Sequence, residues 1–142
     1  FFCLSYIMQI LIFISIFTNL YMIGVSLITH FVTYPSFELI PTKQFQQFHN
    51  AYTKKMLFIV GPIMIIEFIS VFIMVIHNIE FNSIFPFLLV FIIWIFTFFL
   101  IVPLHNQLAK NYNKNINEKL IRFNGLRTSL WVLKFIFLAT II

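Results

Sequence analysis

Residues 56–76 read MLFIVGPIMIIEFISVFIMVI, a nearly continuous apolar run whose only charged residue, Glu67, lies at its centre. A bilayer-spanning α-helix needs about 20 predominantly apolar residues, so this run is long enough to cross a membrane. A charge at the bilayer centre costs about 3 kcal/mol on insertion scales unless it is neutralised or paired. The run therefore predicts a membrane helix with an internal polar site around Glu67.

The composition of the whole chain agrees with a membrane protein of one domain. Of its 142 residues, 61% are hydrophobic and 9% are charged, and the mean hydropathy is +1.01. A soluble domain of this size could not bury so much apolar surface. The single cysteine excludes an internal disulfide and any metal motif built on paired cysteines. The sequence contains no Asp, which excludes Ser/His/Asp hydrolysis and an Asp-based calcium site.

Further apolar runs predict an all-α fold. Residues 1–29 and 84–104 are long enough to span a membrane, and residues 117–142 form a weaker span that contains Arg127 and Lys134. We expect one polytopic domain over residues 1–142, a four-transmembrane-helix bundle with spans at about 1–29, 56–77, 84–104 and 117–142. Residues 42–55 predict an amphipathic interfacial helix between the first two spans. The chain begins with Phe, so we expect an initiating segment upstream.

The basic residues predict the orientation of this bundle. Eight of the nine lie in or beside the first and third connections, and the second connection has none. By the positive-inside rule these two connections are cytoplasmic, and both termini face the other side. The net charge of +5 therefore indicates membrane-flanking residues and not a nucleic-acid partner.

The polar residues of the spans predict a layer at mid-depth. Asn19, Glu67 and Trp94 each lie 11 residues from the cytoplasmic end of their span, or roughly 16 Å of helix rise. Lys134 lies within reach of the same layer. We expect Glu67 to pair with Lys134, or to be held protonated by Asn19 and the Trp94 indole.

A second set of polar residues lies nearer the cytoplasmic end. His30, His49, His105 and Arg127 converge there, and neutral imidazoles bind haem iron and other transition metals. We therefore predict a metal site at His30, His49 and His105. The wider candidate set contains Glu67, Lys134 and Arg127 as catalytic residues and, as cofactor-binding residues, His30, His105, Asn19, Trp94 and Trp131.

Several short motifs resemble an uncharacterised family of small, four-span bacterial integral membrane proteins. The matching pieces are Tyr34-Pro35-Ser36-Phe37, Phe48-His49, Gly61-Pro62 with Met64 and Glu67, Val102-Pro103-Leu104-His105 with Leu108, and Asn124-Gly125-Leu126-Arg127-Thr128 with Trp131 and Lys134. The segment 97–108 is also faintly similar to anthrone-oxygenase-like membrane proteins. The first resemblance implies a multi-pass protein of the bacterial cytoplasmic (inner) membrane.

Three interpretations of function follow from these residues. The first is a membrane-embedded redox or oxygenase-type enzyme with a haem or transition metal, a polar pocket open to the cytoplasm and a small hydrophobic substrate. The second is a small oligomeric carrier or channel that uses Glu67 and Lys134. The third is an accessory subunit of a larger membrane complex, in which polar residues hold helices together. Membrane lipids are expected partners in all three.

Overall fold

The protein is all-helical, as the sequence predicts. The computed structural model describes the backbone of residues 2–141 and the side chains of residues 6–141, and this part of the chain contains no strand. Three helical segments are long and apolar enough to cross a membrane, namely Tyr6–Leu39, Thr42–His77 and Phe81–Leu108. The fourth long helix carries more polar residues and is not among these three.

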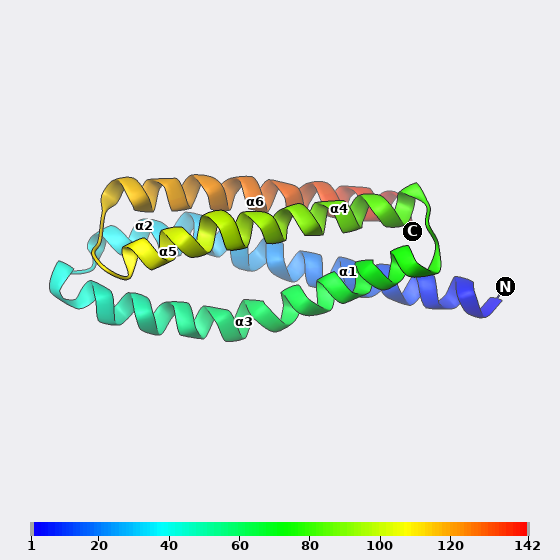
Figure 1. The fold of residues 1–142 in the computed structure, drawn as a ribbon, viewed down its shortest axis with the longest axis horizontal. Coiled ribbons are helices and arrows are strands. Elements are labelled where there is room, and N and C mark those ends of the chain that lie inside the picture. The colour runs from blue at the N-terminus through cyan, green and yellow to red at the C-terminus, as the bar shows by residue number, and fades with distance from the viewer. Residues whose placement is uncertain (1, 142) are drawn as a thin grey trace.

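Four long helical rods lie side by side along the molecule (Figure 1). The first comprises α1 (Phe2–Ile28), the π-helical turn η1 (Thr29–Thr33), α2 (Tyr34–Ser36) and the 3₁₀ turn η2 (Phe37–Leu39). The second is α3 (Thr42–His77). The third comprises α4 (Phe81–Phe96), the π-helical turn η3 (Thr97–Ile101) and α5 (Val102–Leu108). The fourth is α6 (Lys114–Thr140).

These bounds differ from the predicted spans at one end of the bundle. The segment predicted as a separate interfacial helix, residues 42–55, continues into the next span as the single 36-residue helix α3. The first and third rods also continue to Leu39 and Leu108. Helix α6 begins at Lys114, because the Asn113 side chain accepts hydrogen bonds from the backbone N–H groups of Asn115 and Ile116. The helices thus extend further toward this end than hydropathy alone indicates.

The two π-helical turns occur at equivalent places in the first and third rods. Each begins at a threonine, Thr29 or Thr97, and ends two residues before a proline, Pro35 or Pro103. Each threonine hydroxyl donates to the carbonyl four residues earlier, at 2.8 Å. Single π-helical turns inside α-helices are rare overall. Where they occur, they are often found at functional sites. Both threonines face the interior cavity described below.

Apolar side chains pack the interior at three levels. One cluster, with Leu11, Val71, Met74 and Val90, lies toward the end where both ends of the described chain are found (Figure 1). A central cluster contains Met22, Met64, Ile93 and Trp131. The third cluster, which includes Phe37, Phe45, Leu104 and Leu108, fills the opposite end. Large apolar side chains also cover the outer surface, as expected where lipid is the solvent.

Candidate functional site

A fully buried ion pair lies at mid-depth in the bundle. Lys134 Nζ donates to Glu67 Oε1 at 2.5 Å, and neither side chain is exposed. The Trp131 indole Nε1 donates to the other carboxylate oxygen, Oε2, at 3.2 Å. Asn19 Nδ2 donates to the Trp131 backbone carbonyl at 2.8 Å. We call these four residues, Asn19, Glu67, Trp131 and Lys134, the ion-pair layer.

The ion-pair layer confirms one sequence expectation and corrects another. Glu67 pairs with Lys134, as the spacing predicts. The second donor to the carboxylate is Trp131 and not Trp94, whose Nε1 has no hydrogen-bond partner among the described residues. Asn19 contacts the α6 backbone and makes no hydrogen bond to Glu67 within residues 6–141. Both errors have one cause, because residue counting gives depth and does not fix the rotation of a helix about its axis.

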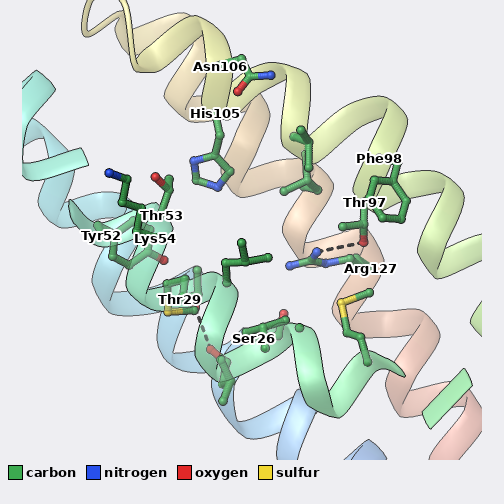
Figure 2. A pocket seen from close by; sticks show the side chains of 18 of the residues that line it. Ser26, Thr29, Tyr52, Thr53, Lys54, Thr97, Phe98, His105, Asn106 and Arg127 are labelled. Carbon is green, nitrogen blue, oxygen red and sulfur yellow. Dashed lines mark hydrogen bonds between the residues drawn. The ribbon is translucent and has the colours of Figure 1, made fainter. Parts of the chain in front are cut away.

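A cavity of about 560 Å³ lies between this layer and the end that carries α2 and α5. Its size is within the usual range for small-molecule sites. Figure 2 shows the His105 imidazole and the Arg127 guanidinium pointing into it from α5 and α6, opposite Tyr52 on α3. The other polar residues that line it are Ser26, Thr29, Tyr34, His49, Asn50, Thr53, Lys54, Thr97 and Asn106. No residue of the ion-pair layer is among the lining residues, so the two candidate catalytic residues Glu67 and Lys134 lie outside this cavity.

Arg127 is the buried cation of this cavity, with 8% of its surface exposed. Its Nη1 donates to Thr97 Oγ1 at 3.1 Å, and its Nη2 donates to Asn124 Oδ1 at 2.9 Å. The guanidinium carbon also lies 5.1 Å from the centre of the Trp131 ring, within the range of a cation–π contact. Its Nε has no hydrogen-bond partner among the described residues. These contacts hold the guanidinium in place without neutralising its charge.

Three side chains form a hydrogen-bonded chain across the cavity. His49 Nε2 and His105 Nδ1 are 3.0 Å apart, and His105 Nε2 is 3.1 Å from the Tyr34 hydroxyl. In neutral imidazoles one ring nitrogen donates and the other accepts, so this chain can run in either direction. The free atom at its far end is His49 Nδ1, which is buried and unpartnered within residues 6–141. Such a chain can pass a proton from one end to the other by reversing the direction of its two hydrogen bonds.

The three predicted metal ligands are not brought together. His30 lies in a second pocket between α1 and α6, where its Cε1 would be 3.0 Å from a Cβ added to Gly125. His49 and His105 are hydrogen-bonded to each other, and both ring nitrogens of His105 are already engaged. Among the described residues no group of three His, Cys, Asp or Glu side chains is arranged to hold a metal ion. His30 therefore lies apart from His49 and His105 in this structure, and a metal site at the three histidines stays a prediction.

The remaining predicted cofactor-binding residues divide between the two sites. His105 and Trp94 line the cavity, whereas Asn19 and Trp131 belong to the ion-pair layer. Sequence reasoning missed Tyr34 and Tyr52 as cavity residues. The available signal for Tyr34 was its place directly before Pro35. The π-helical turn that precedes this proline puts Thr29 and Tyr34, five residues apart, on the same cavity side.

Part of the cavity lining is formed by apolar side chains that are exposed on the outer surface of the bundle. The lining residues Leu57 and Ile65 of α3 and Phe98 of η3 are 68%, 51% and 55% exposed, so each faces both the cavity and the outside. Helix α3 packs along α4 but has few contacts with α5. The exposed lining residues of α3 and the third rod thus include an apolar group, Leu57, Ile65 and Phe98, beside the exposed polar residues Asn50, Lys54 and Asn106.

Comparison with protein-family models, curated proteins and solved structures gives no match to this chain.

Proposed function

We propose that the protein is a polytopic membrane protein that takes an amphiphilic small molecule from the lipid phase into this cavity and exchanges protons with its polar end. In this proposal α6 is a fourth span, and the end with α2 and α5 faces the cytoplasm of a bacterial cell. The exposed apolar side wall carries the proposal. A site for a water-soluble ligand would not need lining residues such as Leu57 and Phe98 that face lipid.

The hydrogen-bonded chain of His49, His105 and Tyr34 supports the proton-exchange part of the proposal. When His49 Nδ1 takes up a proton, His49 Nε2 can pass one to His105 Nδ1, and His105 Nε2 can pass one to Tyr34 as the hydroxyl proton goes to the ligand. Each residue then holds as many protons as before. Such a chain suits an enzyme that protonates or deprotonates a substrate, including the redox-type reaction expected from the sequence.

Metal binding and the carrier interpretation have less support from the arrangement of side chains. A haem or metal at His49 and His105 would require the hydrogen bond between the two rings, or the one from His105 to Tyr34, to break. A carrier that uses Glu67 and Lys134 would need these residues on the ligand pathway, whereas neither lines the cavity.

A cavity-filling substitution tests the proposal. Gly61 lines the cavity, and a Cβ added there would meet only the side chain of Leu57, at 3.6 Å. Gly61→Phe should therefore fill the cavity with little strain on the backbone. Gly24→Phe is the matched control, because a Cβ at this exposed glycine would meet nothing within 4 Å. Both variants add the same apolar side chain to a membrane helix.

The measurement is quenching of tryptophan fluorescence by a brominated long-chain alcohol, with the protein in lipid nanodiscs. Trp94 lines the cavity and reports on a molecule that enters it. We expect saturable quenching in the wild type and in Gly24→Phe, and a loss of about tenfold or more in affinity in Gly61→Phe. Equal saturable quenching in all three proteins would contradict the proposed site.

A further inference from the structure

Arg127 has no carboxylate partner in the described protein. The chain has four acidic residues, all of them Glu. Glu67 is occupied by Lys134, and Glu38 forms an exposed ion pair with Lys114 at 3.8 Å. Glu80 and Glu118 are exposed and form no salt bridge within residues 6–141. The buried guanidinium is therefore balanced by neutral groups alone.

Such an arrangement is unfavourable unless something else supplies the charge. Removing a cation from water costs several kcal/mol, and charges that are buried in proteins are normally paired. The two neutral acceptors of Arg127, Thr97 Oγ1 and Asn124 Oδ1, satisfy hydrogen bonds but carry no negative charge. Arginine is also the residue that best matches carboxylate and phosphate geometry, through two parallel N–H donors.

Further unpartnered polar atoms belong to the same cavity. Within the described residues, Arg127 Nε and Trp94 Nε1 are buried and make no hydrogen bond. Both residues line the cavity, and Trp94 lies one turn before Thr97, which holds the guanidinium. An indole N–H can only donate, so the group that satisfies it must be an acceptor. Two donors from different helices, one on α4 and one on α6, thus have no partner within the described residues.

We infer that the ligand of this cavity is a single-chain amphiphile with an anionic head, a carboxylate or a phosphate, and that Arg127 binds this head. The inference rests on the proposed function, because it names the ligand class of the same site. The apolar chain lies along the wall formed by Leu57, Ile65 and Phe98. The head reaches Arg127 from inside the cavity and accepts from its guanidinium and from the Trp94 indole.

The test compares charged and uncharged ligands that share one apolar chain. Brominated fatty acid is compared with the alcohol of the same length, and brominated lysophosphatidic acid with the matching monoacylglycerol, by tryptophan quenching in nanodiscs of uncharged lipid. We expect at least one anion to bind about 10- to 100-fold more tightly than its uncharged partner, the range that a charged hydrogen-bonded contact gives. Whether the fatty acid or the lysophosphatidic acid shows the larger preference identifies the head as carboxylate or phosphate.

Four substitutions, at three residues, locate the positive charge that is responsible for the preference. Arg127→Met should abolish the preference for the anion, and Arg127→Lys should retain part of it. Lys55→Met is the matched control, because it removes one positive charge from an exposed residue that does not line the cavity. Lys54→Met tests the exposed cation at the cavity rim, where solvent screens the charge and a small effect is expected.

The outcomes separate the two proposals. Equal affinity of the wild type for acid and alcohol would overturn the anionic head and leave the proposed amphiphile site intact. A preference that is lost in Lys54→Met but kept in Arg127→Met would overturn the role of Arg127. No saturable binding of any of the four probes would overturn both proposals. If Arg127→Met does not fold, the wild-type comparison and Arg127→Lys decide the matter.

Discussion

Lys134 and Arg127 are two buried cations on one face of α6, seven residues apart, and their surroundings differ in one respect. Lys134 is neutralised by Glu67 inside the protein, whereas Arg127 is surrounded by neutral hydrogen-bond partners and an open cavity. The Trp131 ring contributes to both sites, since its indole donates to Glu67 and the Arg127 guanidinium lies over it. The comparison indicates a structural role for Lys134, whose counter-ion is internal, and we propose a binding role for Arg127, whose counter-ion would come from outside.

The largest expected effect on stability is at the internal pair. Lys134→Met leaves the Glu67 carboxylate buried with only the Trp131 indole as a partner, and we predict a loss of about 3–5 kcal/mol in the free energy of unfolding. Unfolding by a denaturing detergent, followed by circular dichroism, measures this loss. Lys114→Met is the control, because the pair of Lys114 and Glu38 is exposed and should contribute less than about 1 kcal/mol. Similar losses in the two variants would contradict the assignment of a structural role to the buried pair.

The same substitution at the second cation should have little effect on stability. Arg127→Met leaves no partner stranded, because Asn124 Oδ1 still accepts from Ser26 and the Thr97 hydroxyl still donates to the Ile93 carbonyl. We predict a change of at most about 1 kcal/mol in the free energy of unfolding, since methionine also avoids the cost of burying a charge. The detergent titration used for Lys134→Met measures it. A loss as large as that of Lys134→Met would show that Arg127 is primarily structural.

The two tryptophans sharpen the comparison further. Trp131→Phe removes the hydrogen bond to the Glu67 carboxylate and should cost about 1.5–3 kcal/mol of stability. Trp94→Phe removes an indole N–H that has no partner within residues 6–141, so we expect almost no loss of stability and weaker binding of the anionic probe. Thermal unfolding in nanodiscs and a binding assay that does not rely on tryptophan, such as native mass spectrometry, separate the effects. Weaker binding of the anionic probe in Trp131→Phe, with unchanged binding in Trp94→Phe, would place the ligand head against Trp131.

The smallest expected effect on the affinity for the anionic probe is at Thr97, the residue that positions Arg127. Thr97→Val removes the acceptor of the Arg127 Nη1 hydrogen bond but keeps the shape of the side chain. We predict a loss of a few-fold in affinity for the anionic probe and no change for the uncharged one. Thr53→Val is a suitable control, because Thr53 also lines the cavity and donates to a carbonyl of its own helix, but Arg127 donates to Thr97 and not to Thr53. A loss for both probes in Thr97→Val would indicate a change in cavity shape.

Much of the fold follows from the sequence, because apolar run length determines which segments become long helices. The pairing of Glu67 with Lys134 is one of two alternatives that the sequence leaves open, and the structure shows this one. What could not be predicted depends on helix rotation. Depth along the helices predicts Trp94 as the indole donor to Glu67, whereas the rotation of α4 and α6 places Trp131 against Glu67 and Trp94 in the cavity.

The position of His30 shows a second limit of residue counting. A regular helix would put His30 on the face of Ser26, which contacts Asn124 and Thr128. His30 does pack against α6, at Gly125, whereas the π-helical turn that begins at Thr29 puts both Thr29 and Tyr34 on the cavity side. Such a turn has no reliable signature in the sequence, apart from the proline that follows it. Residue counting could therefore not show that His30 lies apart from His49 and His105, and the metal site stays a prediction.

Thermal unfolding of the wild type and Arg127→Met in nanodiscs, with and without a long-chain fatty acid, tests the central claim most directly. A ligand that binds only the folded state raises the unfolding temperature. If Arg127 takes its counter-ion from outside, the ionised fatty acid should stabilise the wild type and not Arg127→Met, while the alcohol of the same length should affect both proteins equally. Equal stabilisation of the two proteins by the fatty acid would contradict the claim.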